Sequence, residues 1–211
     1  MHGLPVVLAT HNAGKLRELR PLFAAFGIQA IDLGEAGVAP TADDDAVECY
    51  DTFEENAIAK ARHFHARTGL AVFSDDSGLE IAALDGRPGV RSKRWSERVD
   101  LSGAALDAAN NATLVSALAH VADRRARYVC IAAFVNAETE RAERGEIEGE
   151  ILDAPRGTGG FGYDPYFFSR ELGVTFGQAS ISEKEFVSHR GRAFRALLSS
   201  LGPMSERVEP R

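Results

Sequence analysis

Short apolar runs alternate with longer amphipathic segments along the first half of the chain. Residues 6–9 are apolar and end at a turn, and leucine and phenylalanine then recur at helical spacing until Gly27. This pattern predicts a buried strand, a turn and a helix. A second helix is expected from Thr52, whose spacing to Glu55 fits a capping box. A second buried strand is expected at residues 70–73.

The second half of the chain continues the alternation. Residues 104–121 are rich in alanine and leucine and are predicted to form a helix. Residues 128–135 are apolar and β-prone, and residues 146–152 are expected to pair with them as a hairpin. A short strand is predicted at residues 166–168. Strands alternating with helices, together with a hairpin, indicate an α/β fold with a mixed sheet.

The last helix is predicted to begin at Ser182, which forms a possible capping box with Glu185, and to run to about Leu201. The residues that follow, 204–211, are polar and are expected to fray. Residues 1–203 are therefore expected to form one domain. The apolar stripe predicted for the last helix consists of Phe186, Ala193, Phe194, Leu197, Leu198 and Leu201.

Composition narrows the possible functions. The 211 residues carry a formal net charge of −7, which argues against non-specific binding of nucleic acid. Neither a signal peptide nor an apolar run long enough for a membrane helix is expected, so no membrane partner is predicted. The two cysteines, Cys49 and Cys130, form no CxxC motif, and reduced thiols in a cytoplasmic protein are expected.

The turn after the first strand is the first candidate site. A helix N-terminus offers N–H groups and partial positive charge to phosphate, and a lysine adds a point charge. The Walker A spacing is absent, and an ordinary strand-to-helix turn with a surface lysine fits equally well. The segment consists of Thr10, His11, Asn12, Ala13, Gly14 and Lys15.

Paired carboxylates after the second strand are the second candidate. Asp75 and Asp76 follow the apolar run directly, where α/β sheets place ligands. Neighbouring side chains of an extended segment point to opposite sides, so one can face a cleft and hold Mg²⁺ or accept a proton. Glu48 is a possible second carboxylate for the metal, although a solvated charge also explains it. A simple turn is the alternative for residues 74–78.

Two further segments carry possible binding residues. Residues 158–165 are rich in glycine, and Phe161 among them can stack on a base or pack inward with Tyr163. Lys184 lies in the expected first turn of the last helix, where a cation is mildly unfavourable and an anionic ligand would compensate it. Ser188, His189 and Arg190 follow, and a solvated basic face is the alternative there.

Together these segments resemble the inosine triphosphate pyrophosphatase family, also called Ham1-like. Any one motif is modest support, but they occur in order over nearly the whole chain, from residue 6 to about residue 198. The matching segments are Leu8-Ala9-Thr10 with Asn12, Lys15 and Glu18; Thr52-Phe53 with Glu55-Asn56-Ala57 and Lys60-Ala61; Asp75-Asp76-Ser77-Gly78-Leu79; Gly86 with Pro88-Gly89-Val90 and Ser92; Gly159-Gly160-Phe161-Gly162-Tyr163-Asp164-Pro165; and Glu183-Lys184 with Ser188-His189-Arg190-Gly191.

The resemblance implies a fold, an activity and a set of roles. It implies an elongated mixed sheet in two lobes with the nucleotide in the cleft between them, a homodimer, Mg²⁺ as cofactor, and hydrolysis of ITP, dITP or XTP to the monophosphate and pyrophosphate. By position, the resemblance implies that Thr10 to Lys15 and Lys184 bind phosphate, and that Ser77 touches the substrate. Asp76 would accept a proton and, together with Glu48, hold the metal. The base and sugar would contact Phe161, Gly162, Tyr163 and Asp164, and the 6-oxo edge of the purine would be read by His189 and Arg190.

Some positions depart from the family pattern. His11 stands where a small or polar residue is usual, residues 91–95 differ from the usual stretch, and residues 97–111 are unusual. Two other interpretations remain open. One is a related pyrophosphatase of the Maf type, which the motifs at 52–57 and 188–191 disfavour. The other is a non-catalytic nucleotide-binding protein, which the intact Asp76, Glu48 and Lys184 disfavour.

Overall fold

A computed structural model describes residues 4–202, with the side chains of all except Ala42 and Asp45. The expected polar tail, 204–211, lies outside the described residues. The chain divides into two compact units. Unit 1 comprises the residues up to Asp76, Cys130–Gly145 and the residues from Arg190 on, and unit 2 comprises Ser77–Val129 and Glu146–His189.

The strands form one mixed sheet, which confirms the predicted fold class. Its seven strands follow the order β2-β1-β3-β4-β5-β6-β7. Strand β1 pairs in parallel with β2 and β3, whereas β6 pairs antiparallel with β5 and β7. The strands are β1 (Val6–Leu8), β2 (Ala30–Asp32), β3 (Val72–Ile81), β4 (Arg125–Val135), β5 (Glu140–Ile151), β6 (Phe167–Ser169) and β7 (Val174–Thr175).

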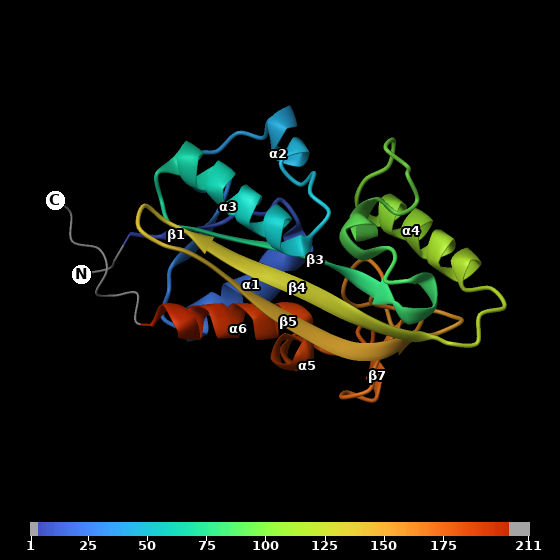
Figure 1. Cartoon of the computed structure of the whole chain (residues 1–211). Helices are drawn as coiled ribbons and strands as arrows, with labels where there is room; N and C mark the ends of the chain where they lie inside the picture. Colours follow the sequence, from blue (N-terminus) through green and yellow to red (C-terminus); the bar gives the residue numbers. More distant parts are fainter. Residues whose placement is uncertain (1–3, 203–211) are drawn as a thin grey trace. The chain divides into compact units, whose positions relative to one another are not determined.

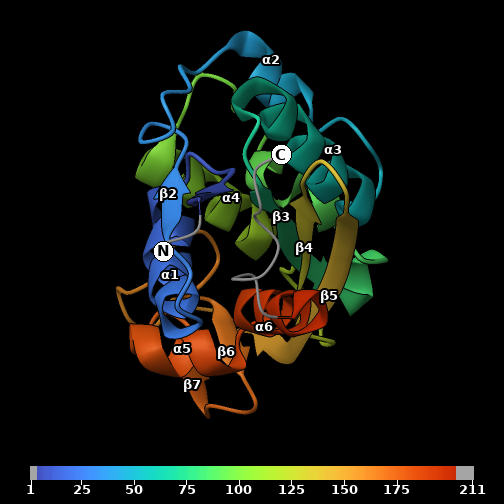
Figure 2. The ribbon, with the colours of Figure 1, turned by 90° about the vertical axis from the view of Figure 1, so that its left-hand side faces the viewer.

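Helices cover both faces of the strands in unit 1. Helix α3 (Phe53–Thr68) lies on one face, and α1 (Ala13–Ala25) and α6 (His189–Leu201, in unit 1 from Arg190 on) lie on the other (Figures 1 and 2). A short helix, α2 (Ala42–Ala46), lies between β2 and α3 in the chain. The core between α1, α6 and the sheet includes Phe23, Phe73, Phe134 and Phe194, all buried, because the apolar stripes of both helices face the same side of the strands.

Unit 2 has its own core. Its helical elements are α4 (Gly103–Ala117), α5 (Ile181–Val187) and two 3₁₀ segments, η1 (Ala82–Leu84) and η2 (Gly89–Arg94). Leu114 and Leu118, at the C-terminal end of α4, are fully buried. They belong to one apolar cluster with Phe176, which follows β7, and with side chains of the strands, which include Leu79, Ile81, Tyr128, Ile147 and Phe167. A separate core of this size holds the elements of unit 2 in place.

Two local predictions were wrong. The strand expected at residues 70–73 continues to Ile81, so the paired carboxylates lie within strand β3 and not beyond its end, and the alternative of a simple turn at 74–78 is excluded. The expected last helix is two helices, because the backbone of Ser188 is extended (φ −65°, ψ 154°) between α5 and α6. The capping box that starts α5 is formed by Ser180 and Glu183, two residues before the predicted Ser182.

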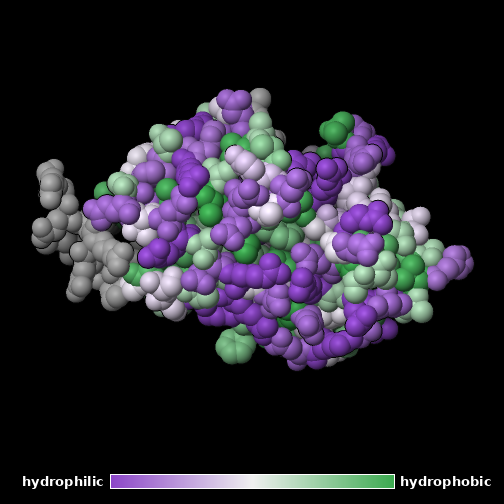
Figure 3. All heavy atoms as spheres, viewed as in Figure 1, coloured by the Kyte–Doolittle hydropathy of each residue, from purple (hydrophilic) through white to green (hydrophobic). Residues whose placement is uncertain are grey.

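The surface is mainly hydrophilic on the face drawn in Figure 3, with hydrophobic residues in small groups among the polar ones. One of the exposed hydrophobic side chains is Phe186, which was expected to be buried and is 77% exposed. Its exposure follows from the break at Ser188, because the stripe of α6 does not continue into α5. Within residues 4–202, no helix combines the length and apolar character needed to cross a bilayer.

Candidate functional site

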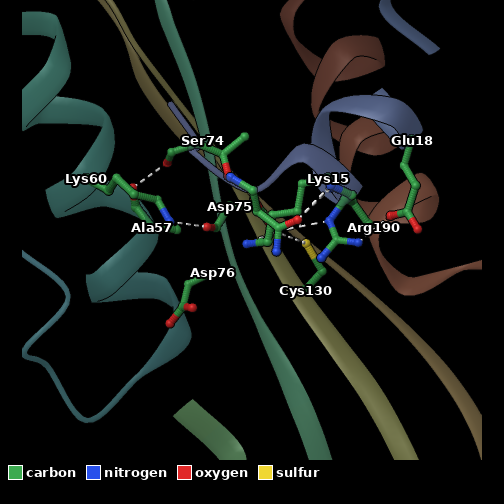
Figure 4. Close-up of polar contacts among 12 residues, drawn as sticks. Lys15, Glu18, Ala57, Lys60, Ser74, Asp75, Asp76, Cys130 and Arg190 are labelled. Carbon is green, nitrogen blue, oxygen red and sulfur yellow. Dashed lines mark hydrogen bonds and ion pairs between the residues drawn. The ribbon is translucent and has the colours of Figure 1, made fainter. Parts of the chain in front are cut away.

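The side chains of Asp75 and Asp76 point to opposite faces of strand β3, as predicted for neighbours in an extended segment. Asp75 lies on the face covered by α1 and α6, and Asp76 lies on the face covered by α3 (Figure 4). Both are buried, with 1% and 9% of their surface exposed. The two carboxylates therefore have different neighbours and different chemistry.

Asp75 forms ion pairs with two cationic side chains. Its Oδ2 atom lies 2.8 Å from the Lys15 amine and 3.2 Å from Nε of Arg190. Burial alone would raise the pKa of Asp75, but Lys15, Arg190 and Lys60 outweigh it and hold that pKa below its usual range. Asp75 is thus a permanent anion that binds helices α1 and α6 to the sheet.

Asp76 has the opposite balance. Its Oδ2 atom accepts a hydrogen bond of 3.0 Å from the side-chain amide of Asn56 on α3. Burial raises the pKa of Asp76 to about 6; Lys60 lowers it and the like charge of Glu48 raises it again. A carboxylate with a pKa near neutrality holds a proton weakly and accepts one readily, which suits a general base.

Lys60 is a central residue of this site that sequence reasoning did not single out. Its amine is buried on α3, donates to Glu48 and donates to the backbone oxygen of Asp75 at 2.5 Å. Burial lowers its pKa, but Glu48, Asp75 and Asp76 raise it above the ordinary value. A signal was present, because Lys60 falls on the same helix face as the apolar Ala57 and Phe64, where a buried charge needs an explanation.

Glu48 and Asp76 are the carboxylates predicted to hold a metal. The Lys60 amine donates to Glu48, and the charge of Glu48 raises the pKa of Asp76, so the two carboxylates interact electrostatically, which sequence reasoning could not establish. Among the described residues no group of three or more histidine, cysteine or acidic side chains forms a metal cage. Mg²⁺ is commonly held by one or two protein carboxylates together with phosphate oxygens, so this donor set fits a cation that arrives with a phosphorylated ligand.

The N-terminus of α1 is capped by Asn12, a residue of the turn between β1 and α1. The side chain of Asn12 accepts hydrogen bonds from the backbone N–H groups of Gly14 and Lys15, at 2.8 and 3.2 Å. The N-terminus of α1 was expected to offer N–H groups to phosphate, and the Asn12 cap satisfies these two of them. Thr10 is half-buried, His11 and Ala13 are exposed, and the Thr10 hydroxyl accepts from the Asn12 N–H.

Arg190 belongs to unit 1 and pairs with two carboxylates there. Its buried guanidinium donates to Glu18 on α1 and to Asp75 on β3. The break at Ser188 makes His189 and Arg190 the first residues of α6. These contacts indicate a structural cation that joins α6 to α1 and β3.

Unit 2 gathers the residues of the glycine-rich loop around Asp164. The Oδ2 atom of this buried carboxylate accepts from the amine of Lys184 at 2.6 Å and from the backbone N–H of Phe161 at 2.8 Å. The Lys184 amine also lies 4.9 Å from the centre of the Phe161 ring. Lys184 was expected to bind phosphate, but its neighbours are the residues expected at the base.

Aromatic rings surround the same region of unit 2. The rings of Tyr128 and His189 are stacked, with centroids 4.6 Å apart and planes 8° apart. Tyr128 also donates to Asp164 at 3.4 Å, a role that its place within an apolar run did not indicate. Tyr163 packs inward and donates to the backbone oxygen of Ser92 at 2.7 Å, whereas Phe161 remains half-buried. Ser77, beside Asp76 in the chain, is half-buried.

Known proteins resemble this chain in sequence and structure. A protein named dITP/XTP pyrophosphatase from Bordetella parapertussis is 47% identical over 93% of this chain and 90% of its own length. One of the same name from Burkholderia pseudomallei is 48% identical over 93% of both chains. The structure of a HAM1 protein from Coxiella burnetii superposes with a TM-score of 0.79 and 37% identity, covering 94% of this chain and 98% of that one. The sequence pattern of the Ham1 family matches residues 6–200, and the chain therefore belongs to the Ham1 family.

Proposed function

We propose that the protein hydrolyses the triphosphates of non-standard purines, dITP, ITP and XTP, to the monophosphate and pyrophosphate, and so removes them before they enter DNA or RNA. The names of the relatives from Bordetella parapertussis and Burkholderia pseudomallei support the substrate class. Asp76 carries the proposal in the structure, because it is a buried carboxylate of raised pKa beside a second carboxylate and a buried amine.

In this reaction Asp76 acts as the general base. In its ionised form it accepts a proton from water, whose oxygen bonds to the α-phosphorus while the bond from that phosphorus to the bridging oxygen breaks. Pyrophosphate leaves with that oxygen. The hydrogen bond from Asn56 holds the carboxylate of Asp76 in one orientation. The positive charge of Lys60 lowers the pKa of Asp76 and so favours its ionised form.

We propose that unit 1 binds the phosphates. Thr10 to Lys15 form the edge of this site, with Gly14 buried and the Lys15 side chain 15% exposed. Asp75 fixes the Lys15 amine, so that its orientation is set before substrate binds.

Glu48 and Asp76 would hold Mg²⁺, which would neutralise charge on the phosphate oxygens. A cation between them would also relieve the repulsion between the two carboxylates. Removal of the metal is therefore expected to stop turnover while the protein remains folded.

We propose that unit 2 recognises the base. Phe161 offers a ring for stacking, and the amine of Lys184 and the imidazole of His189 are donors in the same unit. Donors that meet a 6-oxo group would be left unpaired by a 6-amino purine, and buried unpaired donors are costly. Asp164 holds Lys184 and the loop together. From the family resemblance, Arg190 with His189 is proposed to read the 6-oxo edge, and Lys184 is also proposed to bind phosphate. From the family resemblance we also propose a homodimer located in the cytoplasm.

The test is identification of the products formed from dITP, with Mg²⁺ and with excess chelator. The proposal predicts dIMP and pyrophosphate in equal amounts, no turnover without the metal, and no turnover by the Asp76→Asn variant with Mg²⁺. Release of orthophosphate and dIDP would contradict cleavage between the α- and β-phosphates. Tight binding of ITP without any turnover would support a non-catalytic binding protein instead.

A further inference from the structure

Helix α4 holds one glycine of the candidate base-binding loop by both of its backbone polar groups. The carboxylate of Asp107 accepts from the N–H of Gly162 at 2.9 Å. The side-chain amide of Asn111 donates to the carbonyl oxygen of Gly162 at 3.0 Å. Asp107 and Asn111 are four residues apart on α4, so both project from one face of the helix.

This pair of hydrogen bonds constrains the backbone of Phe161. Peptide groups are planar, so a bond to the Gly162 N–H fixes the plane that also contains the α-carbon of Phe161. On the other side of that residue, the Phe161 N–H is held by Asp164. Gly162 itself is in the left-handed conformation (φ 60°), which glycine adopts without strain. The direction in which the Phe161 ring leaves the backbone is therefore fixed from both sides.

The helix is a firm platform for these bonds. Leu114 is fully buried, and the side chain of Asn110 accepts from the N–H of Ser96 at 2.8 Å and donates to the oxygen of Lys93 at 3.0 Å. Functional geometry is held best by residues on a rigid element. Asp107 and Asn111 both lie within residues 97–111, the stretch that departs from the family pattern.

We propose that Asp107 and Asn111 are positioning residues for purine recognition, which set the orientation of Phe161 through Gly162 and touch no substrate themselves. The proposal rests on the proposed function, since it assigns Phe161 to the base. It predicts that loss of either bond weakens substrate binding more than it slows the chemical step.

The experiment compares Asn111→Ala, Asn111→Asp, Asp107→Ala and Asp107→Asn in steady-state turnover of dITP. Loss of one such hydrogen bond, worth about 1 kcal/mol, is expected to raise KM by about 3- to 10-fold with kcat changed less than about 2-fold. Asp107→Asn keeps an acceptor and should restore most of the loss seen in Asp107→Ala. Asn111→Asp should be worse than Asn111→Ala, because a carboxylate would face the Gly162 carbonyl oxygen.

Thr113→Ala is the matched control. Thr113 lies on the same helix, and its hydroxyl donates to the backbone oxygen of Ala109 within that helix at 3.1 Å. This variant should leave KM unchanged even where it lowers the melting temperature. Unchanged KM in Asn111→Ala and Asp107→Ala, or a fall in kcat alone, would overturn the proposal.

A second readout separates this proposal from the proposed function. Amide hydrogen exchange of residues 159–164 needs no substrate, and it should accelerate in Asn111→Ala and Asp107→Ala but not in Thr113→Ala. If the unaltered protein failed to hydrolyse dITP and the exchange still accelerated, the proposed function would fail while the constraint on the loop stood. If exchange did not change, the positioning role would fail whatever the enzyme hydrolyses.

Discussion

Two adjacent aspartates of strand β3 show how neighbours decide the chemistry of a residue. Asp75 meets the amine of Lys15 and the guanidinium of Arg190, and its pKa is held low. Asp76 meets an amide and the like charge of Glu48, and burial raises its pKa. One carboxylate is therefore structural and the other reactive, although the sequence presents them as a pair.

Asp76 is expected to reduce stability at neutral pH in the metal-free protein. Its folded pKa of about 6 exceeds the unfolded value of about 3.9, so its ionisation opposes folding. This loss of stability is absent below pH 4 and complete above pH 6. The difference between the folded and unfolded pKa values corresponds to a free energy of roughly 1–3 kcal/mol. Asp76→Asn should therefore raise the free energy of unfolding at pH 8 by that amount, measured by urea denaturation with chelator present. At pH 4 the variant and the unaltered protein should be equal, and a gain that did not depend on pH would contradict the assignment.

The same substitution at Asp75 is expected to have the opposite effect. Asp75→Asn removes the anion that pairs with the amine of Lys15 and leaves the buried Arg190 with Glu18 as its remaining carboxylate, and breaking a buried pair costs about 3–5 kcal/mol. Urea denaturation at pH 8 should show a large loss of stability, or the variant should accumulate unfolded. A variant as stable as the unaltered protein would show that Asp75 does not bind the two helices to the sheet.

At the scale of elements, the boundary between α5 and α6 decides where the residues after Lys184 lie. The sequence offered two serine–glutamate pairs at capping-box spacing, Ser180 with Glu183 and Ser182 with Glu185, and local pattern cannot choose between them. The apolar periodicity also did not predict the extended backbone of Ser188. The prediction of one continuous helix was wrong for this reason, whereas the part of the apolar stripe that lies in α6 is buried as predicted.

The choice of cap can be tested directly. Ser180 accepts from the N–H of Glu183, so Ser180→Ala should lower the free energy of unfolding by about 1 kcal/mol. Ser182→Ala is the matched control and should change it by less than about 0.5 kcal/mol. Chemical denaturation of the two variants measures both values, and equal losses would argue against the cap at Ser180.

At the scale of the whole molecule, the order of strands and helices could be predicted because it depends on local periodicity. The α/β class, the hairpin of β4 and β5 and the helices α1, α3 and α4 follow from it. The ion pairs could not be predicted in this way, because the pairs of Arg190 with Glu18 and of Lys60 with Glu48 join residues that are distant in the chain. The division into two units was likewise beyond local pattern, since each unit is assembled from separate segments.

The central claim is that the protein selects 6-oxo purine triphosphates. The most direct measurement is the ratio of kcat/KM for dITP to that for dATP, with Mg²⁺ and with pyrophosphate as the product followed. Donors that meet a 6-oxo group but not a 6-amino group should give a ratio of at least about 100. A ratio near one would contradict the account, even if both nucleotides were hydrolysed rapidly.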